Sequence, residues 1–518
     1  MTKKYCNLFS FFVALLLIAV FLYWPLLKSN LSWIDDHEFV TYFQSQHGLR
    51  LIDVPSVFWN QTEIGSWQNT VRFRPFYFFQ RVLFTSIFEL HATPRFVIRI
   101  ISACITSSIL ALAICTLGMQ SKETRKTLGD HTLFLTSLVV AFVLFTQSGW
   151  SDIVTRLGPS ELELAFGFGL FLLGYSRVLV SMVSPSQLEF FLLLSGLVIC
   201  AGSKENGLVL VLPAAHVVFA YGLPSQNKKR WLVISCFVGC YCVSIFCAIT
   251  NGIVRQGSDV YNNSRGMDVI LQDLTTAIQS SLSRQMLLTT AFLFFISHFS
   301  SNRSAGTFSL LLWAIVITEQ IYYSGGSSSL PRYLILSQLA HVLSIALIIF
   351  CLLSFLGSRG TAPFQFSIVL CVFLASIGGS LSGVRQIAEA SKNRMEITSD
   401  WEETVNNIRN ASTIIGAQQI VIEVDGMARY ELTASVGRFL SILSPGTSNV
   451  LLIADPVVDD PNFDEGLYKQ MLEFSYNGNV AWNIRPKTSL SKIVNTVCLL
   501  IGGTHNLFDS CDKTVRII

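Results

Sequence analysis

The chain has 518 residues, of which 51% are hydrophobic and 13% are charged, and its mean hydropathy is +0.52. A soluble globular protein of this length does not contain so much apolar surface, so the composition excludes that class and indicates a polytopic α-helical membrane protein. The formal net charge of +3 is too small to suggest a nucleic-acid-binding protein.

The first apolar stretch, 7–27, follows Lys3 and Lys4 and is long enough to cross a bilayer. A signal peptide would end in a small-residue cleavage site, and the sequence Lys28-Ser29-Asn30-Leu31 does not resemble one. We therefore expect a first helix that is retained.

Three carboxylates follow this span within four residues, at Asp35, Asp36 and Glu38, with His37 between them. Ionisable groups beside a bilayer are costly to place unless they are solvated, paired or used, so they are candidates for function. The structural alternative is a helix start. Ser32 and Asp35 match a capping box, and acidic residues are common in the first turn of a helix.

The first loop, 28–95, is long, and its aromatic residues alternate with charges, which is typical of helices that lie in the membrane interface. It contains Arg72, Arg74 and Tyr77, and arginine is well suited to bidentate contact with phosphate. An aromatic belt with arginines that reach the headgroups would explain the same residues without a ligand.

Apolar runs predict about eleven membrane spans, at 7–27, 96–118, 132–148, 160–182, 188–202, 206–222, 231–250, 285–299, 307–323, 334–356 and 364–384. Polar motifs stand at the ends of three of them: Arg156 to Glu161, Lys204-Glu205, and Pro331-Arg332-Tyr333. Each also has a structural explanation, as an acidic helix start, a lysine that reaches the surface, or a proline-initiated helix.

Lysine and arginine in the short loops predict the orientation. The basic loops share one side of this path with the N-terminus, and we expect that side to be cytoplasmic; they hold Lys122, Arg125, Lys126, Lys228, Lys229, Arg230, Arg303 and Arg359. The Asp36 loop, the three polar motifs and the C-terminal part fall on the opposite, outer side. This gathering suggests one outward-facing site assembled from several loops, where irregular backbone can line a cavity.

We expect two domains: a transmembrane domain over 1–384 and a small α/β domain on the outer face over 385–518. The second shows alternating helix and strand patterns, at 401–415, 419–424, 429–443 and 449–454. It carries neither a GxGxxG nor a P-loop pattern, so nucleotide binding is not indicated. Cys498 and Cys511 can form a disulfide in an oxidising compartment.

The membrane part, roughly 1–384, resembles the GT-C superfamily of integral-membrane glycosyltransferases, which use polyprenyl-phosphate-linked sugars. The resemblance lies in the order and sidedness of four features: the acidic pair after the first span, the stretch from Arg72 to Tyr77, Lys204-Glu205, and Pro331-Arg332-Tyr333. It implies a lipid-linked donor, an active site on the outer face and a first-loop carboxylate as catalytic base.

On this resemblance we expect sugar transfer to an acceptor hydroxyl, on an envelope glycan such as O-antigen or lipopolysaccharide, on lipid A or on a protein. The expected location is a bacterial inner membrane, with the N-terminus in the cytoplasm and the C-terminal domain in the periplasm. A membrane of the endoplasmic reticulum or of an archaeon stays open as an alternative. The partners would be the donor, the acceptor and membrane lipids, and no nucleic acid.

The chemistry assigns roles to these residue types. An acceptor hydroxyl has a high pKa and needs a carboxylate to take its proton, a role that we expect of Asp36 or Asp35, with Glu38 as a further carboxylate. Negative charge develops on the departing lipid phosphate, so cations should be directed there. Candidates for binding the phosphate and substrates are Arg72, Arg74, Tyr77, Arg156, Glu161, Lys204, Glu205, Arg332 and Tyr333.

Asp35, Asp36 and His37 also offer hard ligands to a divalent cation. We expect catalysis without a metal, because no second acidic motif of the Asp-x-Asp kind follows in a later outer loop. Two other functions stay open. A transporter or flippase of lipid-linked saccharides should carry charges near the bilayer midplane, and a polymerase or ligase of lipid-linked glycans needs no acidic pair.

Overall fold

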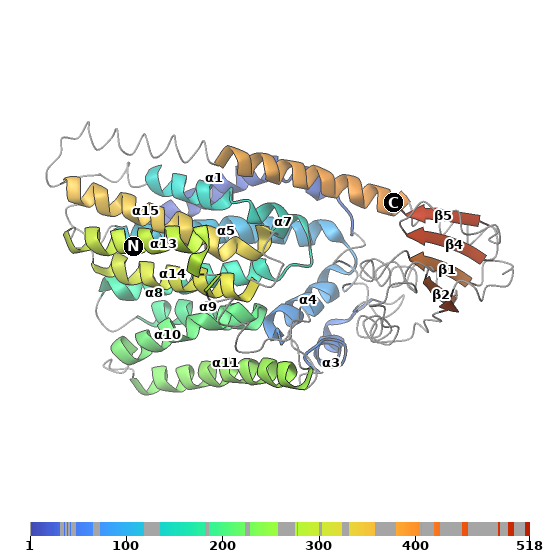
Figure 1. Cartoon of the computed structure of the whole chain (residues 1–518), viewed down its shortest axis with the longest axis horizontal. Helices are drawn as coiled ribbons and strands as arrows, with labels where there is room; N and C mark the ends of the chain where they lie inside the picture. Colours follow the sequence, from blue (N-terminus) through green and yellow to red (C-terminus); the bar gives the residue numbers. More distant parts are fainter. Residues whose placement is uncertain are drawn as a thin grey trace.

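The structure, a computed structural model, consists of a helical bundle and a β-sheet beyond one end of it (Figure 1). It describes residues 2–31, 36, 39, 42, 48–65, 73–118, 135–181, 186–222, 228–256, 275–276, 278–299, 303–323, 331–357, 380–403, 406, 419–424, 448–453, 485–486, 496–501 and 513–517.

The long helices of the bundle are α1 (Thr2–Leu22), α5 (Ala92–Gly118), α8 (Glu161–Ser181), α9 (Gln187–Ser203), α11 (Lys228–Gln256), α13 (Ser281–Phe299), α14 (Arg303–Tyr323) and α15 (Ile335–Gly357). Shorter helices join or flank them: η1 (Pro25–Lys28), η2 (Leu51–Asp53), α3 (Val54–Asn60), α4 (Pro75–Phe88), α7 (Gly149–Thr155), η3 (Glu205–Leu210), α10 (Val211–Val217), η4 (Val218–Gly222) and η5 (Pro331–Leu334). The core lies among α5, α8, α9 and α15, where Phe96, Trp150, Phe168 and Phe171 are completely buried.

Helix ends follow the local sequence. Proline opens α4, where its fixed backbone angle suits the first helical turn. Ser186 and Glu189 form a capping box at the start of α9, in which each side chain bonds the backbone N–H of the other residue. After α9 the backbone is extended at Lys204, so the chain breaks there before η3 begins.

A sharp bend of 66° separates the helix Leu135–Phe145 from α7. The polar groups freed by the bend are paired: the indole N–H of Trp150 donates to the Leu144 carbonyl at 2.8 Å, and the Gly149 N–H donates to Gln338 Oε1 of α15 at 3.0 Å. Irregular backbone inside a membrane protein is tolerated only with such partners.

Five described helices are long and apolar enough to cross a membrane, or six if the bent pair forms one span. This finding supports a helical membrane protein. Among the other predicted spans, three correspond to shorter apolar helices, Phe9–Leu22, Gln187–Ser203 and Glu205–Tyr221. The predicted span 285–299 lies in α13, and most of 364–384 lies outside the described residues. The expected number of eleven stays a prediction.

Helices α8 and α9 approach each other closely because glycines line their contact. A Cβ atom built on Gly196 would lie 2.4 Å from the backbone nitrogen of Phe171, and one on Gly167 would lie 2.9 Å from that of Cys200. Small residues that let backbones approach are the usual means of packing membrane helices. The contact matters for function because α8 and α9 carry Glu161 and Lys204 at adjacent ends.

We therefore expect Gly196→Ala to lower the free energy of unfolding by about 1–3 kcal/mol, since the new methyl group overpacks the contact. Gly239→Ala in α11 is the matched control, because nothing lies within 4 Å of its added Cβ. The control should gain stability by about 0.5–1 kcal/mol from reduced chain entropy. Thermal unfolding of both variants in the same detergent measures the difference, and equal shifts would contradict the packing argument.

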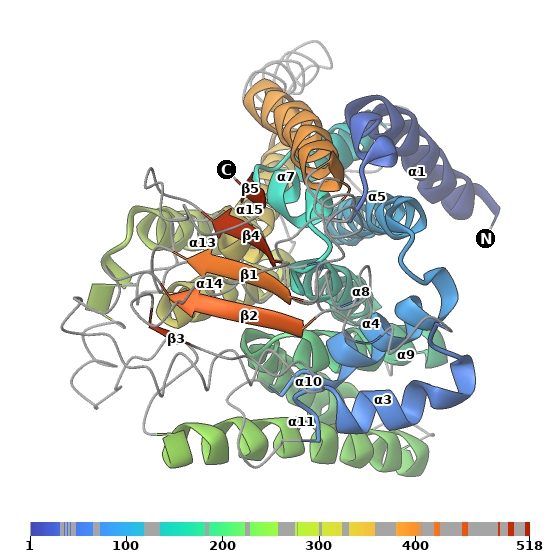
Figure 2. The ribbon, with the colours of Figure 1, turned by 90° about the vertical axis from the view of Figure 1, so that its right-hand side faces the viewer.

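The sheet contains β1 (Gln419–Val424), β2 (Ser448–Ile453), β3 (Arg485–Pro486), β4 (Thr496–Ile501) and β5 (Lys513–Ile517). The strand order is β3-β2-β1-β4-β5, and all pairs are parallel (Figure 2). The strands predicted at 419–424 and 449–454 are thus β1 and β2. The helix predicted at 429–443 and Cys511 lie outside the described residues.

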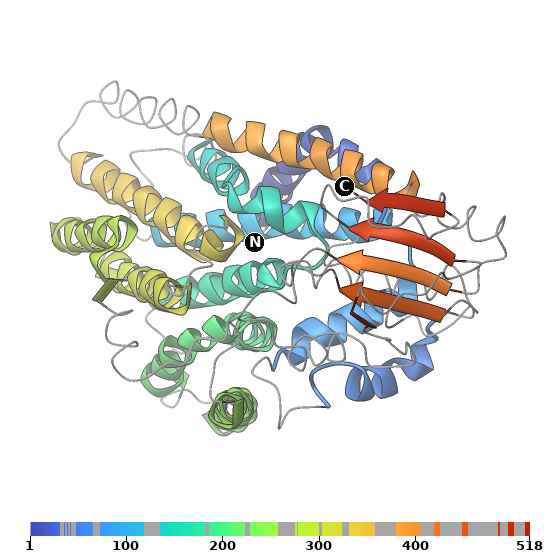
Figure 3. The ribbon, with the colours of Figure 1, turned by 45° about the vertical axis from the view of Figure 1, so that its right-hand side comes forward.

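A helix over 380–403 runs along the bundle toward the sheet (Figure 3). It includes the start of the helix predicted at 401–415, and residues 407–415 lie outside the described part. The predicted domain boundary between 384 and 385 falls within this helix. One continuous element therefore leads from the bundle to the region before β1, and it contacts the first loop through Arg394.

Candidate functional site

Buried and partly buried charges gather at one set of helix ends. They lie in the first two turns of α5, the first turn of α8, the break after α9, the last two turns of α14 and the helix before α15. We call this set the charged cluster: Arg95, Arg99, Glu161, Glu163, Lys204, Glu319 and Arg332. Buried charges are stable only when they are paired and hydrogen-bonded, so their partners decide what each group does.

Lys204 lies at the centre of the cluster, 2% exposed, with its ammonium bound to the Glu161 carboxylate of α8. The ammonium also lies 4.8 Å from the ring centre of Tyr333. The Arg332 guanidinium packs on that ring and donates to the Tyr333 hydroxyl at 3.1 Å. Three predicted residues from two distant motifs therefore meet around one phenol ring.

Arg74 and Glu205 form a bidentate pair, in which Nε and Nη2 donate to the two carboxylate oxygens at 2.8 and 2.9 Å. This pair joins the first loop to the Lys204 turn. Burial raises the pKa of Glu205, but the charge and hydrogen bonds of Arg74 outweigh it and hold that pKa below the ordinary value. Glu205 is therefore ionised at neutral pH.

Asp152 in α7 accepts two cations, because Arg156 and Arg332 each lie 3.5 Å from one of its oxygens. The sequence motifs did not single out Asp152. Its position one turn before Arg156, in the second arm of the bent pair, explains the omission: only the bend turns it toward Arg332.

Asp36, the predicted base, is completely buried and accepts a hydrogen bond from Arg394 Nη2 at 2.5 Å. Its negative charge also acts on Arg95 and Arg99, so it belongs with the charged cluster. One ion-pair partner of Asp36 is Arg394, which comes from the helix 380–403.

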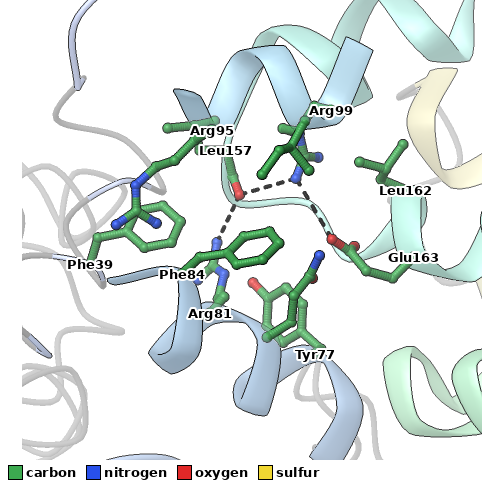
Figure 4. A pocket seen from close by; sticks show the side chains of 11 residues that line it. Phe39, Tyr77, Arg81, Phe84, Arg95, Arg99, Leu157, Leu162 and Glu163 are labelled. Carbon is green, nitrogen blue, oxygen red and sulfur yellow. Dashed lines mark hydrogen bonds and ion pairs between the residues drawn. The ribbon is translucent and has the colours of Figure 1, made fainter. Parts of the chain in front are cut away.

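A pocket lies beside the cluster, between α4, α5 and the segment that joins α7 to α8 (Figure 4). Its walls combine three arginines, one carboxylate and several aromatic and aliphatic side chains: Phe39, Tyr77, Gln80, Arg81, Phe84, Arg95, Ile98, Arg99, Leu157, Leu162 and Glu163. Of these, only Tyr77 was predicted, and its hydroxyl donates to the Gly158 carbonyl at 2.5 Å.

Arg99 holds the backbone that follows α7. It donates to the carbonyls of Ile153 and Pro159 at 2.6 and 3.0 Å, and one of its nitrogens lies 3.9 Å from Glu163 (Figure 4). The Ile153 carbonyl lies at the end of α7 and needs a donor, and Pro159 lies between α7 and α8, so Arg99 is a positioning residue for the segment that leads to Glu161 at the start of α8.

Glu319 has a similar structural role. Its carboxylate accepts the backbone N–H groups of Leu336 and Ser337 at 3.3 and 2.7 Å and so caps the start of α15.

The structure brings several of the predicted site residues together. Arg74, Tyr77, Glu161, Lys204, Glu205, Arg332 and Tyr333 lie in or beside the cluster, and Arg156 joins it through Asp152. The predicted residues Asp35, His37, Glu38 and Arg72 lie outside the described residues. Sequence reasoning missed Arg81, Arg95, Arg99, Asp152, Glu163 and Arg394. The available signal was the pair Arg95 and Arg99, one helical turn apart at the start of an apolar run.

Within the described part of the chain, no group of three His, Cys, Asp or Glu residues is arranged to hold a metal ion. Of Asp35, Asp36 and His37, which were considered above as metal ligands, the structure describes only Asp36. A metal site at these residues therefore stays a hypothesis. The arrangement is suited to a different chemistry, because cationic side chains near a buried carboxylate can bind a phosphate and orient a hydroxyl group.

A comparison of the sequence with models of protein families found no match, and a comparison with curated proteins found none either.

Proposed function

We propose that this protein is a membrane glycosyltransferase of the GT-C kind. It transfers a sugar from a polyprenyl-phosphate donor to an acceptor hydroxyl on an envelope glycan, such as O-antigen or lipopolysaccharide. The active site faces the outer, periplasmic side of a bacterial inner membrane, and the C-terminal domain lies on the same side.

One observation carries the proposal: cations from three distant segments approach one another beside a buried carboxylate. Glu161 binds Lys204 and also interacts electrostatically with Arg74 and Arg332. Asp36 acts on Arg99, which in turn interacts with Glu161. A chain that needed these groups only for surface solvation would have no reason to bury them together.

The reaction would be a single inverting displacement. The acceptor oxygen attacks the anomeric carbon, its proton passes to Asp36 or Asp35, and the bond between that carbon and the phosphate oxygen breaks. The phosphate leaves with its electron pair and is stabilised by the cations Lys204, Arg332 and Arg74. Arg394 donates a hydrogen bond to the Asp36 carboxylate and can orient it toward the acceptor hydroxyl.

A transporter of lipid-linked saccharides fits less well. In the described helices the cluster lies at helix ends: Arg95 and Arg99 in the first turns of α5, and Lys204 just after α9. A transport site is expected near the bilayer midplane. A polymerase or ligase of lipid-linked glycans would share the topology, but it would not require a buried carboxylate at Asp36.

The test is a transfer assay with purified full-length protein, radiolabelled polyprenyl-phosphate hexose and candidate acceptor glycans. We expect label to move to the acceptor and the product anomer to be inverted. A donor that stays intact with every acceptor, while reconstituted vesicles move a lipid-linked saccharide across the bilayer, would favour the transporter instead.

A further inference from the structure

The pocket of Figure 4 carries an excess of positive charge. Arg81, Arg95 and Arg99 line it and are each less than a tenth exposed, and Glu163 is the carboxylate in its wall. Glu163 lies on the Arg99 side, opposite Arg95, and the charge of Asp36, which does not line the pocket, also acts on Arg95.

The Arg95 guanidinium has more N–H donors than it has acceptors among the described residues. It is 3% exposed, and its Nη2 donates to the Glu89 carbonyl at 2.6 Å. Among the described residues its Nε and Nη1 have no hydrogen-bond partner. The ring of Phe39 covers the guanidinium at 4.0 Å, which strengthens its attraction to a negative charge by excluding water. Buried N–H groups of a charged side chain are costly to leave without acceptors.

The cavity has a volume of about 20 Å³, room for one water-sized group. One oxygen of an oxyanion fits this space, while the rest of the group and any chain attached to it must stay outside. Arg95 lies in the first turn of α5, a candidate membrane span, so the pocket is at a span end, where lipid headgroups lie.

We infer that the Arg95 pocket binds a phosphoryl group, with one oxygen inserted between Arg95 and Arg81. Two guanidinium groups on either side of one phosphate oxygen can each donate a charge-assisted hydrogen bond to it. Lys204, Arg74 and Arg332, which are proposed to stabilise the leaving phosphate in sugar transfer, do not line this pocket. The inference therefore goes beyond the proposed sugar transfer and does not depend on it. The phosphoryl group belongs either to a lipid headgroup or to free phosphate.

The experiment measures binding to the full-length protein in nonionic detergent by titration calorimetry, at constant ionic strength and without sugar donor. One arm uses inorganic phosphate, and the other uses dodecyl phosphate in mixed micelles. The variant Gln80→Glu adds a carboxylate to the pocket wall without removing a buried arginine. We expect it to weaken binding about tenfold or more, because like charges repel in a buried site. Gln187→Glu, at an exposed position that starts α9, is the matched control.

If both probes bind, and Gln80→Glu weakens binding while Gln187→Glu leaves it unchanged, the site is supported. Free phosphate is then a sufficient ligand. Binding of dodecyl phosphate alone, with the same response, would support it as a headgroup site. Absence of binding, or equal binding by both variants, would overturn the inference. If Gln80→Glu does not fold, Arg95→Lys replaces it and should also weaken binding, since the lysine ammonium lacks the planar fork of N–H donors that a guanidinium presents. Failure of sugar transfer would leave these results unaffected.

Discussion

Asp36→Asn is expected to lower the turnover rate of sugar transfer by about 10²–10⁴-fold, the usual contribution of a general base. The asparagine keeps the shape of the side chain and an oxygen that can accept from Arg394, but it cannot take the acceptor proton. The donor affinity should change little. The measurement is kcat and KM in the radiolabel assay, together with thermal unfolding of the same preparation.

Arg394→Gln separates catalysis from stability. It removes one cationic partner of Asp36 and keeps the carboxylate. Each variant disturbs the same buried pair, so both should lower the free energy of unfolding, by up to about 3–5 kcal/mol. Only Asp36→Asn should remove most of the turnover. If both variants lose stability and turnover in parallel, Asp36 has a structural role. Full activity in Asp36→Asn would leave Asp35 as the base, which Asp35→Asn then tests.

Elements defined by local apolar patterns were predicted closely. The strand pattern at 419–424 coincides with β1, and that at 449–454 differs from β2 by one residue. The helical class follows from composition alone. Span ends were less accurate, because apolar runs do not reveal a bend. The run at 132–148 does not end there but turns by 66° and continues to Thr155, and the partners that satisfy the bend come from α15.

The site was predictable only where polar residues stand out against apolar neighbours. Lys204, Glu205 and Arg332 interrupt long hydrophobic stretches, and burial makes such residues costly unless they are paired. Arg394 gives no such signal, since it lies in a helix with many exposed charges and meets Asp36 across 358 residues of sequence. Arg95 falls at the end of the predicted first loop, 28–95, because the apolar pattern of the next predicted span begins at residue 96. Tertiary pairing of this kind is not contained in a local pattern.

Lys204→Met is expected to reduce both stability and sugar transfer. It leaves the Glu161 carboxylate buried without its lysine, so the free energy of unfolding should fall by about 3–5 kcal/mol. If Lys204 also stabilises the leaving phosphate, kcat/KM for the donor should fall by about 10²–10³-fold. The double variant Lys204→Met with Glu161→Gln removes both charges and should recover much of the stability. It should not recover transfer, because the cation that faces the phosphate is still absent.

The exposed pair Arg385 and Glu389 provides the matched control for this cycle. Their side chains are 80% and 56% exposed, and such a surface pair contributes only about 0.2–1 kcal/mol, so Arg385→Met should leave both stability and transfer near the starting values. The decisive quantity is the activity of the double variant at a temperature where it is fully folded. If transfer returns along with stability, Lys204 serves only to neutralise Glu161, and the phosphate must be bound by Arg74 or Arg332. If stability returns and transfer does not, the loss of transfer comes from the two removed groups, Lys204 and Glu161, and not from a weakened fold.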